Sequence, residues 1–278
     1  MSKAKAVPVL MYHHVTPAGG MINATPQNFE SQLKWLRKHG YRSLSSTQFA
    51  EHLDGNPAPG KSVLITFDDG YLDNYVYAYP LLKKYGFQAM IFLVTSWMQD
   101  GEARPCAGEG SLPNTPDHAT CKSLALAQNY DDFALRWSEV HRMAEDGVCE
   151  FHSHTHTHTR WDQIDPSNKD THMAHELQMS RQILETQFGH ASDHLCWPQG
   201  YFDADYQRLA KASGFRYQYT TQPFGQNLPG TDPAHIYRFA VRNTHGSSIG
   251  RRIMVAGHPV VGPLFNRWKL WKRSRRQR

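Results

Sequence analysis

The stretch SVLITFDDG, residues 62–70, joins an apolar run to a polar turn. The six residues Ser62–Phe67 carry no charged side chain, which is typical of a strand buried on both faces. A helical pattern, Leu72–Tyr85, follows and ends before Gly86, and Phe87–Val94 is the next strand-like run. Because parallel strands need a crossover that is usually helical, this strand–helix–strand order predicts a parallel sheet.

The same alternation extends along the chain in both directions. Further strands are expected at Val7–Tyr12, Tyr41–Leu44, Val148–Phe151, His194–Trp197 and Phe215–Thr220. Further helices are expected from Pro26 (after the N-cap Thr25) to His39, and over Ser46–Leu53, Phe133–Asp146, Lys169–Phe188 and Ala204–Ser213. The sequence therefore predicts an α/β fold with a mostly parallel sheet, either open or closed into a barrel.

Residues 97–131 interrupt this alternation. They are rich in Gly, Pro, Asn and Asp, so we interpret them as an insertion or lid. We find no internal repeat and no domain linker elsewhere. The sequence thus predicts one catalytic domain over residues 1–266, with an insertion at about 97–131, followed by a basic tail at 267–278.

Polar residues follow four of the predicted strands. They are His13-His14, Asp68-Asp69, the cluster 152–158 and the turn Pro198-Gln199-Gly200. Functional residues in parallel α/β folds lie at the carboxyl ends of the strands. We therefore expect these four groups to face one site.

The pair Asp68-Asp69 offers two carboxylates at a strand end. One can bind a metal while the other accepts a proton. The alternative is a turn or a helix cap, since Asp-Asp-Gly is common in turns.

Histidine occupies every second position from His152 to His158. On an extended chain all four rings would share one face, whereas a turn would pair His154 with His158 or His152 with His156. Imidazole suits zinc and other late first-row divalent metals. Two His and one Asp would leave coordination positions open, which is typical of catalytic sites. The alternative is an adventitious metal-binding surface loop.

Three motifs together resemble those of the polysaccharide deacetylases of carbohydrate esterase family four. They are TFDDG at 66–70, SHTHTH at 153–158 and the Pro-Gly turn near 198–200, within a resemblance that spans roughly Val7 to Pro229. The resemblance implies a distorted (β/α) barrel of parallel strands. It assigns Asp68 as the general base and Asp69, His154 and His158 as ligands of a divalent metal, with Zn²⁺ expected. His152 and His156 fall at non-ligand positions.

The family's general acid is a histidine in an L-x-x-H motif. Leu10-Met11-Tyr12-His13 matches this motif at the N-terminal end, in the permuted arrangement of poly-N-acetylglucosamine deacetylases. The resemblance therefore assigns His13 as the acid and His14 as its neighbour. His258, in Val-Ala-Gly-His, is the rival candidate.

The sequence departs from the family at R-x-P-[YF]-G, which here is Cys196-Trp197-Pro198-Gln199-Gly200. The arginine that would steady the catalytic Asp is missing from this motif, and Gln199 replaces the usual aromatic residue. The resemblance still implies that the Gln199 backbone N–H stabilises the oxyanion. Trp197, Pro198 and Tyr71 are expected to contact the sugar.

The net charge of +5 is concentrated in the tail RWKLWKRSRRQR, residues 267–278. It holds seven basic residues and no acidic one, leaving 23 basic against 25 acidic residues elsewhere. Basic residues beside tryptophans suit an anionic membrane surface. The alternative is a solvated end without a partner. Nucleic acid is not an expected partner, because no basic-aromatic patch appears elsewhere.

Four cysteines contain no C-x-x-C pair, which argues against a thiolate zinc site. Free thiols are the favoured interpretation, and a Cys106–Cys121 disulfide is the alternative for an exported protein. No apolar run is long enough for a membrane span, and no secretory signal is recognisable. The expected location is therefore cytoplasmic, at the inner face of the membrane if the tail binds there.

The expected activity is removal of N-acetyl groups from an N-acetylhexosamine. The location favours a lipid-linked sugar or a lipopolysaccharide precursor as substrate. Two alternatives stay open: a deacetylase of extracytoplasmic poly-N-acetylglucosamine, peptidoglycan or a chitin-like chain, and a non-catalytic carbohydrate-binding protein on the same fold.

Overall fold

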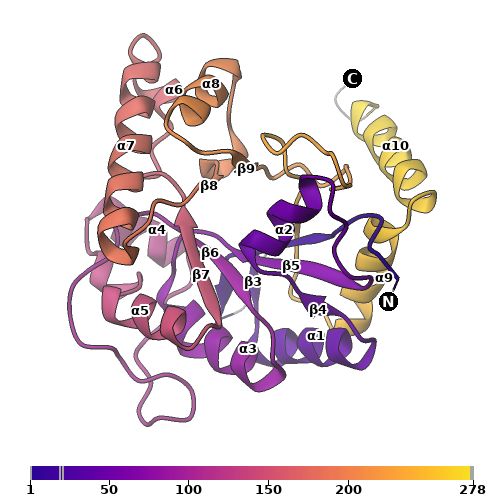
Figure 1. The fold of residues 1–278 in the computed structure, drawn as a ribbon. Helices are drawn as coiled ribbons and strands as arrows, with labels where there is room; N and C mark the ends of the chain where they lie inside the picture. The colour runs from indigo at the N-terminus through magenta and orange to yellow at the C-terminus, as the bar shows by residue number, and fades with distance from the viewer. Residues whose placement is uncertain (1, 19, 21, 276–278) are drawn as a thin grey trace.

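The computed structural model describes residues 2–18, 20, 22–275, and its centre is a sheet of parallel strands (Figure 1). Within these residues the sheet order is β10-β1-β5-β6-β7-β8-β9, and β4 pairs with the first half of β5. The strands are β1 (Val9–Tyr12), β4 (Arg42–Ser43), β5 (Ser62–Phe67), β6 (Ala89–Leu93), β7 (Cys149–Ser153), β8 (His194–Cys196), β9 (Tyr217–Tyr219) and β10 (Phe239–Ala240). Strands β2 (His14–Val15) and β3 (Asn23–Ala24) form a separate parallel pair.

One short segment, residues 236–240, joins the two ends of this sheet. Ile236 forms a parallel bridge with Tyr219 of β9, and four residues later Ala240 pairs with Met11 of β1. The sheet therefore curls round on itself. The predicted distorted barrel of parallel strands is confirmed.

Helices pack around the sheet, with α1, α3 and α5 side by side along its lower face in Figure 1. The helices are α1 (Pro26–Lys38), α2 (Ser46–Leu53), α3 (Tyr79–Tyr85), α4 (His118–Leu126), α5 (Trp137–Glu145), α6 (Trp161–Ile164), α7 (Lys169–Phe188), α8 (Ala204–Ala212), α9 (Gly246–Gly257) and α10 (Val261–Ser274). Helix α1 begins as predicted: the Thr25 side chain accepts a hydrogen bond from the Asn28 N–H, and Phe29 and Leu33 are buried.

The predicted helix Leu72–Tyr85 is confirmed, but its hydrogen-bonding pattern changes along its length. A π-helical turn, Asn74–Ala78, precedes α3. The reason is Pro80, which lacks the N–H that would bond the carbonyl four residues earlier and so disfavours continuous α-helix at this point.

The segment 97–131 contains helix α4, which the composition did not predict. Asp117 caps α4 by accepting the Thr120 N–H at 2.8 Å. Cys106 and Cys121 lie in this segment, and both are buried free thiols. The domain boundaries stay a prediction.

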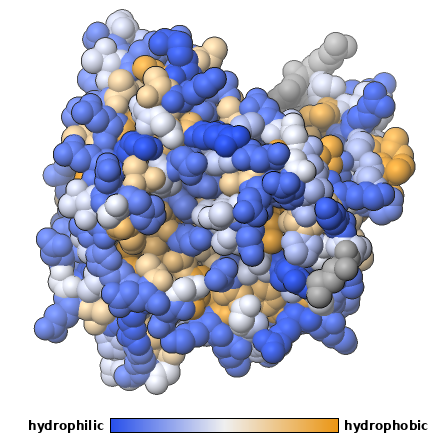
Figure 2. Space-filling model, in the orientation of Figure 1, coloured by the Kyte–Doolittle hydropathy of each residue, from blue (hydrophilic) through white to orange (hydrophobic). Residues whose placement is uncertain are grey.

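Helices α9 and α10 end the described chain. The predicted tail begins inside α10, and its last three residues, 276–278, lie outside the described residues. Leu264, Trp268 and Trp271 are exposed on α10, and apolar side chains gather at the right edge of Figure 2 over this helix. Among the described helices, none combines the length and apolar character that crossing a bilayer requires.

Candidate active site

A cavity of about 840 Å³ opens at the carboxyl ends of β1, β5, β7 and β8. The structure brings the predicted residues together there, because parallel strands end at the same edge of the sheet. The predicted residues that line it are His13, Asp68, Asp69, Tyr71, His154, His158, Trp197 and Gln199. The segment 97–131 supplies part of another wall, including His118 and Tyr130.

Asp69, His154 and His158 form a compact triad. Asp69 Oδ1 lies 3.3 Å from His154 Nε2 and 3.5 Å from His158 Nε2. One potential ligand atom from each residue lies within 4.8 Å of the others. These three side chains could therefore hold one metal ion.

The chemistry of the triad fits a cation. His154 Nδ1–H donates to the Cys196 carbonyl at 2.8 Å, so Nε2 faces Asp69 Oδ1 and offers it a lone pair whenever the ring is neutral. That oxygen is buried and accepts no hydrogen bond from the described residues. Two electron-rich atoms at this distance repel unless a proton or metal ion lies between them.

The pKa shifts point the same way. Burial lowers the pKa of His154, but Cys196 and Asp69 override this effect and raise it well above its ordinary value. Burial lowers the pKa of His158 to about 4. The pKa of Asp69 is held well below its usual value by the two histidines, against the effect of burial. Asp69 and His154 thus attract positive charge, and burial keeps His158 neutral, which is the form of imidazole that binds a metal.

Several residues at the site have left-handed backbone conformations. The φ angles are 75° at Asp69, 66° at Thr155, 62° at His158 and 54° at Gln199. Side chains other than glycine rarely adopt this region, and such strain concentrates at functional sites. The surrounding structure must therefore hold these turns in place.

Glu176 of α7 holds the histidine turn, and the sequence analysis missed it. Its Oε2 accepts the backbone N–H groups of His156 and Thr157 at 2.8 and 2.7 Å. Its Oε1 accepts the Trp161 indole N–H at 3.2 Å. The only sequence signal was a carboxylate beside Leu177 on the buried face of a helix.

Arg238 supplies the arginine that is missing from the 196–200 motif, which corrects the expectation of an unsupported base. Its two Nη atoms donate to Asp68 Oδ1 and Oδ2 at 2.6 and 2.8 Å, and both side chains are buried. Its Nε donates to the Thr220 carbonyl at 2.9 Å. Burial would raise the pKa of Asp68, but Arg238 holds it below its ordinary value, so the carboxylate is ionised.

His13 faces this ion pair across the cavity. Its Nε2 lies 3.9 Å from Asp68 Oδ2, and its side chain is 21% exposed. Burial lowers the pKa of His13. The Asn74 amide fixes the neighbouring backbone by donating to the His13 carbonyl at 2.9 Å.

The rival histidines lie elsewhere. His14 is fully buried, where its Nδ1 donates to Asp73 at 2.6 Å and its ring stacks on Tyr71. His258 is exposed at the end of α9 and does not line the cavity. Only His13 among these three faces Asp68.

The turn at 197–200 borders the cavity, but two of its residues that were expected to contact the sugar are buried. Trp197 has no exposed side-chain surface and stacks on Tyr206, so it supports the wall from behind. Pro198 is buried, whereas Gln199 is exposed. No hydrogen bond from the Gln199 N–H is found within the described residues, so this donor is available.

Tyr71 is 3% exposed and lines the cavity beside Asp69.

The remaining histidines of the cluster are engaged outside the triad. His152 Nδ1 contacts the Ser192 hydroxyl at 2.8 Å, and His156 Nδ1 contacts the Thr95 hydroxyl at 2.9 Å. His118, which the sequence analysis missed, lies on the insertion with its Nδ1 3.2 Å from His14 Nε2. Its position has no signal in the local sequence.

A family model described as polysaccharide deacetylase matches residues 55–218. The polysaccharide deacetylase candidate YxkH of Bacillus subtilis (strain 168) is 28% identical over 80% of this chain, and this chain spans 66% of its length. The poly-beta-1,6-N-acetyl-D-glucosamine N-deacetylase of Staphylococcus epidermidis is 26% identical over 80% of this chain and 68% of its own length.

Solved structures share the fold. IcaB from Ammonifex degensii superposes with a TM-score of 0.71 at 22% identity, covering 90% of this chain and 98% of IcaB. Streptococcus pyogenes deacetylase PplD, solved in complex with acetate, gives the same TM-score at 21% identity, with 90% and 99% coverage. These likenesses establish the architecture described above.

Proposed function

Because the chain belongs to the polysaccharide deacetylase family, we propose that it is a metal-dependent hydrolase that removes N-acetyl groups from an N-acetylhexosamine in a glycan. The observation that carries the proposal is the convergence in one cavity of Asp69, His154 and His158 with the ionised Asp68. A non-catalytic binding protein would not need a buried base beside a strained ligand triad.

In this proposal Asp69, His154 and His158 would hold a divalent ion. Two imidazoles and a carboxylate with open positions favour Zn²⁺. When bound, such an ion polarises a carbonyl and lowers the pKa of water toward about 7.

Side-chain and backbone groups of the protein then transfer the protons and stabilise the oxyanion. Asp68, kept ionised by Arg238, accepts a proton from the attacking water. The Gln199 N–H donates to the oxyanion that develops on the acetyl carbonyl, a role for which one donor typically contributes about 2.7–4 kcal/mol. His13 donates a proton to the departing amine, so that water and amide become acetate and a free amino sugar. Tyr71 and the turn at Trp197-Pro198 shape the sugar pocket.

Two substrate classes have specific support. The name of the Staphylococcus epidermidis relative favours poly-β-1,6-N-acetylglucosamine. The apolar and basic surface of α10 favours a lipid-linked sugar or a lipopolysaccharide precursor, presented at an anionic membrane. We prefer the second class and place the protein at the inner face of the cytoplasmic membrane, in peripheral contact through residues 267–278.

The test of the activity is acetate release by zinc-loaded protein from N-acetylated oligosaccharides. Asp68→Asn should keep its metal and lose about 10²–10⁴-fold in turnover, since a general base typically contributes that much. His154→Ala should lose the metal. Full activity of Asp68→Asn would refute the assignment of the base.

The test of the membrane contact is flotation with anionic phosphatidylglycerol vesicles. Replacing both Trp268 and Trp271 by serine should abolish flotation, because these exposed rings would insert at the interface. Equal flotation of this variant and the wild type would refute the role of α10.

A further inference from the structure

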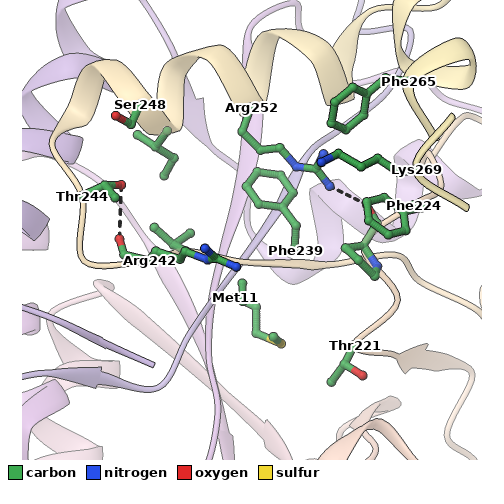
Figure 3. A pocket seen from close by; sticks show the side chains of 14 residues that line it. Met11, Thr221, Phe224, Phe239, Arg242, Thr244, Ser248, Arg252, Phe265 and Lys269 are labelled. Carbon is green, nitrogen blue, oxygen red and sulfur yellow. Dashed lines mark hydrogen bonds between the residues drawn. The ribbon is translucent and has the colours of Figure 1, made fainter. Parts of the chain in front are cut away.

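A second cavity, of about 460 Å³, lies beside the candidate active site between β10, α9, α10 and the loop near residue 223 (Figure 3). Thr221 lines both cavities. Met11 lines the second one, and His13, two residues further along the chain, lines the first. A ligand in the second cavity would therefore sit next to the catalytic groups.

Aromatic rings surround one cation in this cavity. The Arg252 guanidinium lies 5.0 Å from the ring centroids of Phe239 and Phe265 and 5.6 Å from that of Phe224. One of its nitrogen atoms donates to the Pro223 carbonyl at 2.7 Å. These contacts fix the orientation of the guanidinium, and its remaining donors are left for a ligand.

The cavity has excess positive charge. Arg242, Arg252 and Lys269 line it, and no carboxylate does. In the part of the chain that the structure describes, none of the three forms an ion pair. Lys269 Nζ lies 5.3 Å from the same Phe265 ring that Arg252 approaches, and Figure 3 shows the two charged ends directed toward each other. An anion between them would relieve this repulsion.

The ligand must also satisfy the apolar part of the lining. Phe224, Phe239 and Phe265 provide that surface, and helix α10 beside them exposes Leu264 and Trp268 to solvent. A phosphate joined to a hydrocarbon chain matches this combination, since arginine binds phosphate with paired hydrogen bonds and the chain buries apolar area.

We propose that this cavity binds the phosphate and the adjoining hydrocarbon of an alkyl or prenyl phosphate carrier, while the attached N-acetylated sugar reaches the triad past Thr221. The inference rests on the proposed function, because it names the carrier of the same substrate. The size of the cavity lies within the usual range for small-ligand sites, about 300–1,000 Å³.

The test is calorimetric binding of decyl phosphate, below its micellar concentration, to the full-length zinc-loaded protein. Arg252→Gln should weaken binding at least tenfold, and Lys269→Gln should weaken it several-fold. Arg251→Gln is the matched control, because Arg251 is the exposed neighbour on the same helix and does not line the cavity. It should bind within twofold of the wild type.

Two further probes identify the ligand class. Decyl phosphate should bind at least tenfold more tightly than either inorganic phosphate or decanol. Equal binding of inorganic phosphate would mean a simple anion site, and equal binding of decanol would mean a simple apolar site; either result overturns the proposal. Equal losses in the Arg252→Gln and Arg251→Gln variants would also overturn it, and circular dichroism shows whether each variant is folded.

Acetate release by the wild type from a soluble N-acetylated oligosaccharide separates this inference from the proposed function. Release of acetate without binding of decyl phosphate refutes the carrier site alone. Binding without acetate release, either from this oligosaccharide or from an N-acetylated sugar joined to decyl phosphate, refutes the deacetylase proposal, on which the carrier assignment depends.

Discussion

Replacing Arg238 by methionine should destabilise the protein severely. Methionine keeps much of the apolar volume but removes five hydrogen-bond donations, to both Asp68 oxygens, Thr66, the Thr220 carbonyl and Cys196. Asp68 would remain buried and ionised without a partner. Leaving one charge of a buried ion pair without its partner is strongly destabilising, because no attraction then offsets the desolvation of the carboxylate.

The magnitude follows from these contacts. Removing one partner of a buried pair lowers the free energy of unfolding by about 3–5 kcal/mol. Loss of the hydrogen bond to the Thr220 carbonyl lowers it by about 1 kcal/mol more. The sum, roughly 4–6 kcal/mol, is comparable to the whole stability of many domains, which is about 5–15 kcal/mol. Arg238→Lys should be milder, since it keeps a charge but loses the paired geometry.

The assay is urea unfolding at 25 °C. Arg216→Met is the matched control: Arg216 pairs with Asp54 at 2.6 Å, but its side chain is 56% exposed. An exposed pair contributes only about 0–1 kcal/mol. The double variant Asp68→Asn/Arg238→Met should be about 1–3 kcal/mol more stable than the sum of the single losses predicts.

The reasoning would be refuted if Arg238→Met lost no more stability than Arg216→Met. Strict additivity of the Asp68 and Arg238 replacements would also count against it, because the two side chains would then act independently.

Three other outcomes are expected. Glu176→Ala should weaken zinc binding about 10–100-fold in competition with a chelator, since the turn that carries His158 loses its anchor; unchanged affinity would contradict that role. Zinc affinity should rise from about pH 5 to pH 8, because the raised pKa of His154 makes protons compete with the metal at low pH; a flat profile would contradict this. Gly200→Ala should lower the melting temperature by at least about 4 °C, because the new Cβ would lie 2.0 Å from Thr221 Oγ1 at a φ of 70°; a melting curve that overlays the wild type would contradict it.

Local patterns predicted the architecture well. Buried strands such as Ser62–Phe67 and capped helices such as Pro26–Lys38 are specified by neighbouring residues, so their periodicity is visible in the sequence. The π-helical turn before Pro80 shows the limit of this approach, because a proline near the start of one helix is compatible with several backbone conformations before it.

The residues of the candidate site also divide into those that local motifs predict and those that only the folded structure brings there. Asp68, Asp69, His154 and His158 lie in two short motifs, and parallel topology is enough to bring the ends of β5 and β7 together. Arg238 lies 170 residues from the carboxylate that it binds. The ion pair between the two side chains forms only when the sheet curls round on itself. The residues next to Arg238 in the sequence therefore do not predict it. His118 is likewise placed by the packing of the insertion.

The position of Arg238 in the closing segment 236–240 also has a consequence for biosynthesis. A chain that emerges from the ribosome exposes Asp68 long before residue 238 has been made. Until then the future base lacks its guanidinium and the β-sheet has two open edges. Closing the barrel and pairing the buried base with its guanidinium are therefore one maturation step, and nascent fragments that stop before Ile236 would lack this ion pair.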